Sequence, residues 1–233
     1  MRSIMGDFAE KGIYGIPIAT LDVETTGLGP EARVCQLAIV HSNLGQGNSE
    51  VVFNEYINPC MPIPEAASVV HGITDEKVAS CPVFWDLFPR IQKALDGRIM
   101  AAYNLPFDLD QVNKEMRTCP VDLDPYPWFG ICGLVLSRFV DDMHRGKGAH
   151  KLESVAGRRQ MTFKAHDAAE DAMITSKLLD LLFREAAQKR GRFGTVREYW
   201  AFQRVVAIQQ EEDLRCYLRK KGVNRPSWPW TDR

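Results

Sequence analysis

Apolar positions near the amino terminus alternate with polar ones or form short runs, a pattern that predicts strands. Three such segments are 16–24 (IPIATLDVE), 33–42 (RVCQLAIVHS) and 50–58 (EVVFNEYIN). A turn around Pro30 separates the first two, and 43–49 (NLGQGNS) contains only residues that suit a hairpin loop. Because short turns join antiparallel neighbours, we expect an antiparallel meander with the first strand at one side.

After residue 64 the pattern changes to strands that alternate with helices. Apolar runs predict a fourth strand at 98–103 and a fifth within 128–136, the latter running into a helix. The segments in which apolar residues recur at helical spacing are 65–70, 82–95, 107–117, 150–156 and 167–189. This order of elements predicts the α/β class, with a mixed sheet flanked by helices.

The character of the chain changes again beyond Lys189. Residues 191–194 (GRFG) are interpreted as a hinge, and 195–198 (TVRE) fits a capping box that begins a helix ending near Leu218. The tail 224–230 (NRPSWPW) contains too much proline for a helix. We therefore expect three parts, namely an N-terminal lead-in (1–15), a main domain (16–189) and a C-terminal helical extension with a Pro/Trp-rich tail (190–233).

Bulk composition is that of an ordinary globular protein. The 233 residues are 45% hydrophobic and 25% charged, with a net charge of −1. The six cysteines are scattered without a CxxC pair, which indicates reduced thiols in a cytoplasmic protein. No run of 18 apolar residues and no apolar leader occurs, so neither a membrane span nor a signal peptide is expected.

Charge is distributed unevenly along the chain. The stretch from Arg138 to Lys164 contains seven Lys or Arg residues and three acids. The stretch from Arg184 to Lys221 contains ten Lys or Arg residues and five acids. The loop 141–149 (DDMHRGKGA) carries Arg145 and Lys147, which are either solvated or available to phosphates. The helix after residue 195 likewise either packs on the core with a solvated basic face or guides a nucleic-acid strand.

Two carboxylates at the end of the first strand stand out chemically. Asp22 and Glu24 are two positions apart, so both side chains leave the same face of a strand. Paired acids at the end of a buried strand are costly unless a cation neutralises them, and hard divalent ions prefer carboxylate oxygens. The alternative is a strand that ends in a solvated acidic turn.

Three further residues gain interest from their positions. Asp108 follows the fourth strand at the start of a helix, where an acid is also favoured by the helix dipole alone. His166 and Asp171 lie at the head of the long helix, where a structural histidine and a solvated acid are the ordinary interpretation. Each is commonplace singly, and the case rests on their combination.

Taken in order, these residues resemble the DEDD superfamily of 3′–5′ exonucleases, in its histidine-bearing (DEDDh, DnaQ-like) branch. That branch includes the proofreading epsilon subunit of bacterial replicative polymerase, ribonuclease T and oligoribonuclease. The resemblance covers about residues 16–185 and rests on the motifs 22–27 (DVETTG), 70–74 (VHGIT), 104–108 (NLPFD) and His166 with Asp171.

The resemblance implies a ribonuclease H-like fold, with a five-stranded mixed sheet and helices on both faces. It implies two Mg²⁺ or Mn²⁺ ions held by Asp22, Glu24, Asp108 and Asp171, with His166 as the general base that takes a proton from the attacking water. The chemistry agrees, because paired cations stabilise both oxygens of an in-line phosphodiester displacement. Histidine accepts protons near neutral pH.

The family also implies how the end of the substrate is held. Each of these side chains has an ordinary alternative as a core or turn residue. The implied substrate-binding residues are Thr25, Thr26, Leu28, His71, Asn104 and Phe107.

The function expected from the resemblance is metal-dependent 3′–5′ exonuclease activity on single-stranded DNA, which releases nucleoside 5′-monophosphates. The alternatives are an RNA-trimming exoribonuclease like ribonuclease T and a non-catalytic nucleic-acid-binding module that keeps the fold. A polymerase or repair partner is expected, no membrane is involved, and the oligomeric state stays open.

Overall fold

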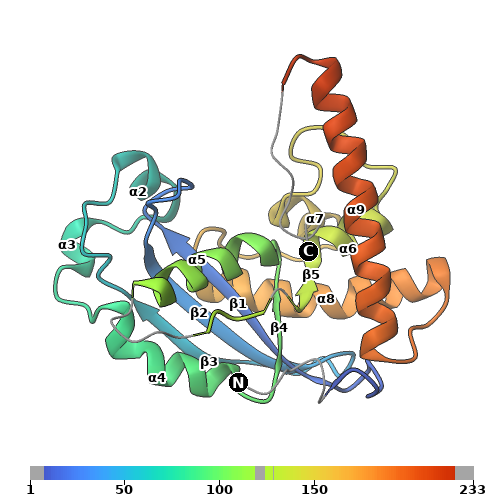
Figure 1. Cartoon of the computed structure of the whole chain (residues 1–233), viewed down its shortest axis with the longest axis horizontal. Coiled ribbons are helices and arrows are strands. Elements are labelled where there is room, and N and C mark those ends of the chain that lie inside the picture. Colours follow the sequence, from blue (N-terminus) through green and yellow to red (C-terminus); the bar gives the residue numbers. More distant parts are fainter. Residues whose placement is uncertain (1–7, 119–123, 128, 224–233) are drawn as a thin grey trace.

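The computed structural model describes residues 8–118, 124–127 and 129–223 (Figure 1). Its centre is a five-stranded sheet in the order β3-β2-β1-β4-β5. The strands are β1 (Pro17–Thr25), β2 (Val34–Asn43), β3 (Ser49–Tyr56), β4 (Ile99–Ala102) and β5 (Ile131–Cys132).

The sheet is mixed, as the sequence predicts. β1 pairs with β2, and β2 with β3, in antiparallel orientation, which gives the expected meander. On its other edge β1 pairs with β4 in parallel, and β4 pairs with β5 in parallel. β1 is therefore an outer strand of the meander and the central strand of the whole sheet. Its carboxyl end consequently lies between two neighbouring strands rather than at an outer strand of the sheet.

The helices follow the predicted order with small shifts at their ends. They are α2 (Glu65–His71), α3 (Asp75–Val78), α4 (Phe84–Leu95), α5 (Leu105–Arg117), α6 (Gly133–Val140), α7 (Leu152–Arg158), α8 (Ala168–Arg190) and α9 (Val196–Lys220). The short helix α3 is absent from the sequence prediction. It begins where the Thr74 hydroxyl accepts a hydrogen bond from the Lys77 amide, and a single turn is too short to show periodicity.

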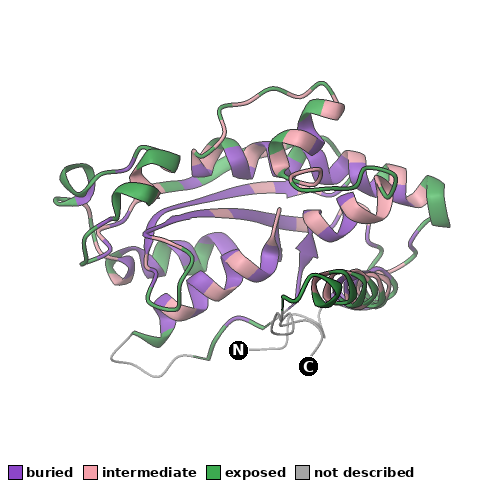
Figure 2. Cartoon of the chain, turned by 90° about the horizontal axis from the view of Figure 1, so that it is seen from above, coloured by how far each residue is buried: buried purple, intermediate pink, exposed green. Residues whose placement is uncertain are grey.

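Helices cover both faces of the sheet, which lies as a buried layer between them (Figure 2). α8 packs across β1, β2, β3 and β4 on one face, while α5 crosses the other face with α4 beside it. The α4 and α5 side holds one large apolar cluster, which includes Leu21, Ile39 and Ile91. The α8 side holds a second, which includes Phe183 and Tyr199.

A buried ion pair attaches α5 to the meander. The Arg33 guanidinium donates two hydrogen bonds to the carboxylate of Glu115, at 2.9 and 2.7 Å. The same carboxylate accepts the Val34 amide at 2.9 Å, and Glu115 is only 1% exposed. Since a buried carboxylate without a partner is costly, this contact holds α5 in place against β2.

The C-terminal helix α9 packs on the rest of the fold rather than standing free. Its Gln203 is fully buried, and its side chain accepts the Cys132 amide at 2.8 Å and donates to the Gly130 carbonyl at 2.9 Å. The Tyr199 hydroxyl donates to the same Gln203 oxygen at 2.7 Å. α9 is thereby bonded to β5, and it also packs on α6.

Parts of the sequence prediction lie outside the described residues. These are the first half of the lead-in (1–7), Cys119, Trp128 and the Pro/Trp-rich tail (224–233). Within the described ranges, no helix is both long enough and apolar enough to cross a membrane.

Candidate active site

The parallel pairing of β1 with β4 brings the motifs 22–27 and 104–108 together. Asp22 and Glu24 belong to β1, whose carboxyl end lies beside that of β4. The chain turns after β4 directly into α5, and Asp108 sits in the first turn of that helix. Asp108 is 4% exposed and Glu24 9%, so these carboxyls lie largely out of water.

The motif of His166 and Asp171 lies at the head of α8. The Asp167 carboxylate caps this helix by accepting the amides of Ala169 and Glu170. His166, just before the cap, adopts a left-handed backbone conformation with φ 66°, and its amide donates to the Asp171 carboxylate at 3.0 Å. This bond and the backbone turn direct the His166 imidazole outward, where the side chain is 47% exposed.

One cavity of about 200 Å³ collects all five predicted catalytic residues. It is lined by Asp22, Val23, Glu24, Tyr103, Asn104, Phe107, Asp108, Leu152, Glu153, His166 and Asp171. Within it, ligand atoms of Glu24, His166 and Asp171 lie within 4.8 Å of one another. Residues from β1, α5, α7 and α8 therefore converge on one small volume.

The carboxyls of this cavity resist ionisation. Burial, with smaller contributions from Asp171 and Asp167, raises the pKa of Glu24 to about 7. Burial also raises the pKa of Asp171 to about 6, although the His166 amide opposes the shift. The pKa values of Asp22 and Asp108 are raised as well, first by burial and then by neighbouring carboxylates. Among the described residues, burial and neighbouring acids therefore outweigh the groups that favour the charged forms.

The donor set fits divalent cations. The Asp171 Oδ1 and Asn104 Oδ1 atoms are buried and have no hydrogen-bond partner among the described residues. Carboxylate and amide oxygens are the ligands that hard divalent ions prefer, and a cation would remove the repulsion that raises these pKa values. Glu24, Asp171 and His166 form a group with the spacing of a metal site.

Two of the six predicted substrate-binding residues line the cavity, and the other four do not. Asn104 and Phe107 line the cavity itself. Thr25 and Thr26 are not among its lining residues, because their hydroxyls face the turn after β1. The Thr25 hydroxyl donates to the Gly27 carbonyl at 2.7 Å, and the Thr26 hydroxyl accepts the Arg33 amide at 3.1 Å.

Leu28 and His71 lie outside the cavity lining. Leu28 is 86% exposed. His71 Nδ1 accepts the Ile73 amide at 3.1 Å, so Nε2 carries the proton that points to the Thr25 carbonyl at 3.3 Å. Burial lowers the pKa of His71, which favours this neutral form. His71 thus supports the backbone at Thr25.

Besides Val23, which lies within the motif 22–27, the cavity wall contains three residues that were not predicted. Tyr103 directly follows β4, and Leu152 and Glu153 open α7. Glu153 Oε1 lies 3.7 Å from His166 Nε2. Only the position of Tyr103 beside Asn104 gave a signal, since an acid in the first turn of a helix is common for reasons unrelated to a site.

The greater part of the chain matches a family of known nucleases. The exonuclease family RNase_T matches residues 20–179, which is more than half of the chain. The chain belongs to this family. The predicted membership in an exonuclease family is therefore confirmed. Exonucleases of this family use divalent metal ions, in keeping with the spacing of Glu24, His166 and Asp171 described above.

The chain matches a small part of two long relatives and most of one short relative. A DNA polymerase III subunit epsilon-like protein of Rhodobacter capsulatus is 35% identical over 109 residues, 46% of this chain and 16% of that protein. The uncharacterized exonuclease CP81 of Escherichia phage 186 is 27% identical over 72% of this chain and 88% of its own length. A PolC-type DNA polymerase III of Streptococcus sanguinis is 27% identical over 73% of this chain and 11% of that protein.

Solved structures share the fold. Escherichia coli exonuclease I in complex with a dA16 oligonucleotide superposes with a TM-score of 0.64 at 19% identity, covering 81% of this chain and 44% of that one. Exonuclease X in complex with 5′ overhanging duplex DNA superposes with a TM-score of 0.56 at 22% identity, covering 76% and 95%. The predicted ribonuclease H-like fold is thereby confirmed.

Proposed function

We propose that this exonuclease removes nucleotides from the 3′ end of single-stranded DNA and releases nucleoside 5′-monophosphates. The observation that carries the proposal is the convergence of the four predicted metal-binding carboxyls and His166 on one cavity of about 200 Å³.

Two Mg²⁺ or Mn²⁺ ions are the cofactors we propose, held by Asp22, Glu24, Asp108 and Asp171. When bound, such cations supply charge stabilisation to the attacking and leaving oxygens of the phosphodiester. The raised pKa of Glu24, about 7, supports this assignment, because burial and neighbouring acids make this carboxyl costly to ionise and a cation would offset that cost. The unpartnered Asp171 Oδ1 is a ready ligand atom on the same wall.

His166 is the proposed general base. Its backbone is held by the bond from its amide to Asp171, while its imidazole is accessible to water at the cavity mouth. Glu153 lies 3.7 Å from Nε2, where its carboxylate stabilises the imidazolium that forms when the ring takes a proton. A base of this kind acts in the transition state rather than in binding.

The terminal nucleotide is held, in this proposal, by the remaining wall. Phe107 and Leu152 offer apolar surface to a sugar or base, and the Asn104 side chain offers polar atoms to the phosphate. Thr25 contributes through its backbone at the end of β1, since its hydroxyl is engaged by Gly27. Thr26, Leu28 and His71 shape the approach to this point.

The nature of the strand and its setting rest on the relatives. Those named as DNA polymerase III proteins support DNA as the substrate and a place in replication or repair, with a polymerase or repair partner. The described cysteines are all free, which supports a reducing compartment such as the cytoplasm. We further propose that residues 16–189 are the exonuclease domain and residues 190–233 an extension of it.

The test is a side-by-side digestion of DNA and RNA strands of identical sequence, with Mg²⁺, with Mn²⁺ and with EDTA. We expect shortening of the DNA from its 3′ end, no activity in EDTA, and recovery when metal is restored. Faster shortening of the RNA would replace DNA by RNA in the proposal. Activity that persists in EDTA would overturn the metal assignment.

A further inference from the structure

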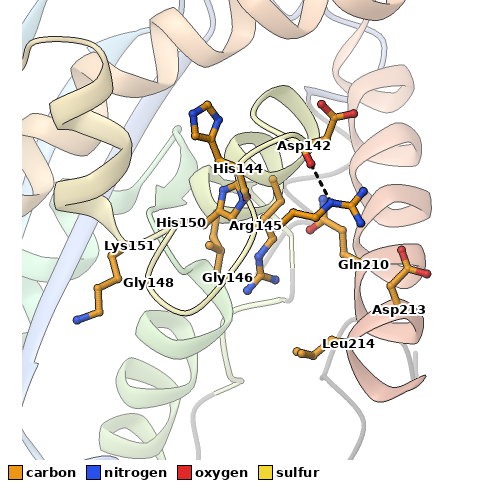
Figure 3. A pocket seen from close by; sticks show the side chains of 12 residues that line it. Asp142, His144, Arg145, Gly146, Gly148, His150, Lys151, Gln210, Asp213 and Leu214 are labelled. Carbon is orange, nitrogen blue, oxygen red and sulfur yellow. Dashed lines mark hydrogen bonds between the residues drawn. The ribbon is translucent and has the colours of Figure 1, made fainter. Parts of the chain in front are cut away.

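A second hollow, larger than the active-site cavity, lies between α6, the loop that follows it and α9. Its volume is about 540 Å³, within the usual range for ligand sites of about 300–1,000 Å³. Figure 3 shows loop residues His144, Arg145 and His150 on one side and Gln210 and Leu214 of α9 on the other. Because α9 lies beyond the residues that match the family, 20–179, this wall is a feature of the chain's own extension.

The lining of this hollow carries a surplus of positive charge. Arg138 of α6 and Arg145 and Lys151 of the loop contribute cations. Of the two acids in the lining, Asp142 is paired with Lys189 of α8 at 2.8 Å. Asp213 accepts a hydrogen bond from Gln209 at 3.1 Å. The net field therefore favours an anion.

The loop is held in place rather than loosely attached. Its first residue, Asp141, accepts hydrogen bonds from Arg158 and Arg159, at the end of α7, at 2.7 and 3.0 Å among others. At its far end, His150 Nε2 bonds with the His144 carbonyl at 2.9 Å. Burial lowers the pKa of His150, which favours the neutral ring. The hydrogen bond from this ring to the His144 carbonyl fixes the shape of the loop. The cationic side chains thus extend from a fixed frame.

The walls of this hollow and of the active-site cavity adjoin along the chain. Lys151 lines the hollow, and the next two residues, Leu152 and Glu153, line the cavity. Tyr103 lines the cavity and donates its hydroxyl to the His150 carbonyl at 2.8 Å. Adjacent Cα atoms are about 3.8 Å apart, so the two linings adjoin at Lys151 and Leu152.

The hollow also offers groups that suit a nucleotide rather than a bare anion. Gln210 donates to the Val135 carbonyl at 3.1 Å, which leaves its buried Oε1 without a partner among the described residues. Gln210 and Leu214, four positions apart on α9, both line the hollow and offer it an amide and an apolar side chain. Single-strand sites combine such contacts with cations that follow the backbone.

We propose that this hollow is a backbone-binding subsite for the substrate strand, in which Arg145 and Lys151 contact phosphates upstream of the 3′ end. The inference rests on the proposed function and adds a second point of attachment to it. Such a subsite would let the acidic cavity, which repels phosphate on its own, retain a strand between successive cleavages.

The direct test measures binding of a labelled single strand of about twelve nucleotides, a length typical of such sites, by fluorescence anisotropy in Ca²⁺. Arg145→Glu and Lys151→Glu are each expected to raise Kd about threefold to tenfold. Each should also reduce the salt slope by about 0.7, because one side chain no longer neutralises a phosphate. Arg145→Lys should retain most of the binding. The matched control is Lys93→Glu, an exposed position on α4, which should leave Kd unchanged.

Length dependence separates this subsite from the cavity. The weakening in the two charge-reversal variants should be greater for the long strand than for a dinucleotide, which does not reach the hollow. Equal weakening at both lengths, or the same Kd as Lys93→Glu, would overturn the proposal. So would weakening confined to a free nucleoside monophosphate, which would assign the hollow to mononucleotides. Melting temperatures of all variants verify that the fold is kept.

Cross-linking provides a measurement that needs no variant. A photoreactive base placed at successive positions upstream of the 3′ end should attach to residues 141–151 or 210–214. Attachment only elsewhere would contradict the subsite. These outcomes differ from failure of the proposed function, in which the wild-type protein would not shorten the strand at all.

Discussion

The acidic cluster lowers the free energy of unfolding of the metal-free protein, and a substitution at Glu24 measures this effect. We expect Glu24→Gln to stabilise the metal-free fold, although it removes a proposed metal ligand. The side chain is 9% exposed, and burial with neighbouring acids raises its pKa to about 7 from its usual 4.5. Glutamine has nearly the same shape and carries no charge, so the substitution removes the charge and little else.

The magnitude and its pH dependence follow from the pKa difference. A carboxyl with a folded-state pKa above its unfolded-state value binds more protons when folded, so stability falls as pH rises between the two values. At about 1.4 kcal/mol for each tenfold change in the ionisation equilibrium, the penalty from Glu24 is about 3 kcal/mol at about pH 8 and about 1 kcal/mol at about pH 5. Glu24→Gln should recover that amount.

The assay is urea unfolding of the EDTA-treated protein at both pH values. For a chain of this length the gain at the higher pH corresponds to roughly 6–12 °C in Tm. Glu170→Gln, at an exposed position in the first turn of α8, is the matched control and should change stability little. A Glu24→Gln effect that is destabilising in EDTA, or equal at both pH values, would refute the electrostatic account of the cavity.

Three further outcomes test separate parts of the structure. His166→Ala should lower kcat by at least about a hundredfold with a smaller change in KM, and should alter the pH–rate profile; an unchanged profile would remove its role as base. Glu115→Ala should destabilise by about 3 kcal/mol in urea unfolding, because Arg33 and the Val34 amide lose their partner. Gln203→Ala should cost about 2–3 kcal/mol by the same assay, and a cost below about 0.5 kcal/mol would show that α9 contributes little to the fold.

Local pattern predicted most of the fold, because its elements are long or strongly patterned. The alternation in β1 and the apolar spacing of α8 are properties of neighbouring residues, and both elements form close to where the pattern places them. α3 escaped prediction because it is a single capped turn. Pairing between distant positions also escaped, as with Asp180 of α8, which accepts the amides of Gly45 and Gly47 in the β2–β3 hairpin.

The same distinction applies to the site. Asp22 and Glu24 were found because paired acids at the end of a buried strand are chemically unusual, whereas Asp108 gained its role only from its combination with the other motifs. Glu153 was not, since its place beside His166 arises only when α7 folds against the head of α8. The second hollow was equally invisible, because it forms between a loop and a helix separated by some sixty positions along the chain.

The central claim is tested most directly by digestion of a single-stranded DNA labelled at its 5′ end, in Mg²⁺, with wild-type protein and Asp22→Asn. For the wild type we expect a ladder of strands that shorten stepwise from the 3′ end, together with free nucleoside 5′-monophosphates. Asp22→Asn should be folded and inactive. Immediate release of the label as a mononucleotide, internal cuts without a ladder, or full activity of Asp22→Asn would contradict the account.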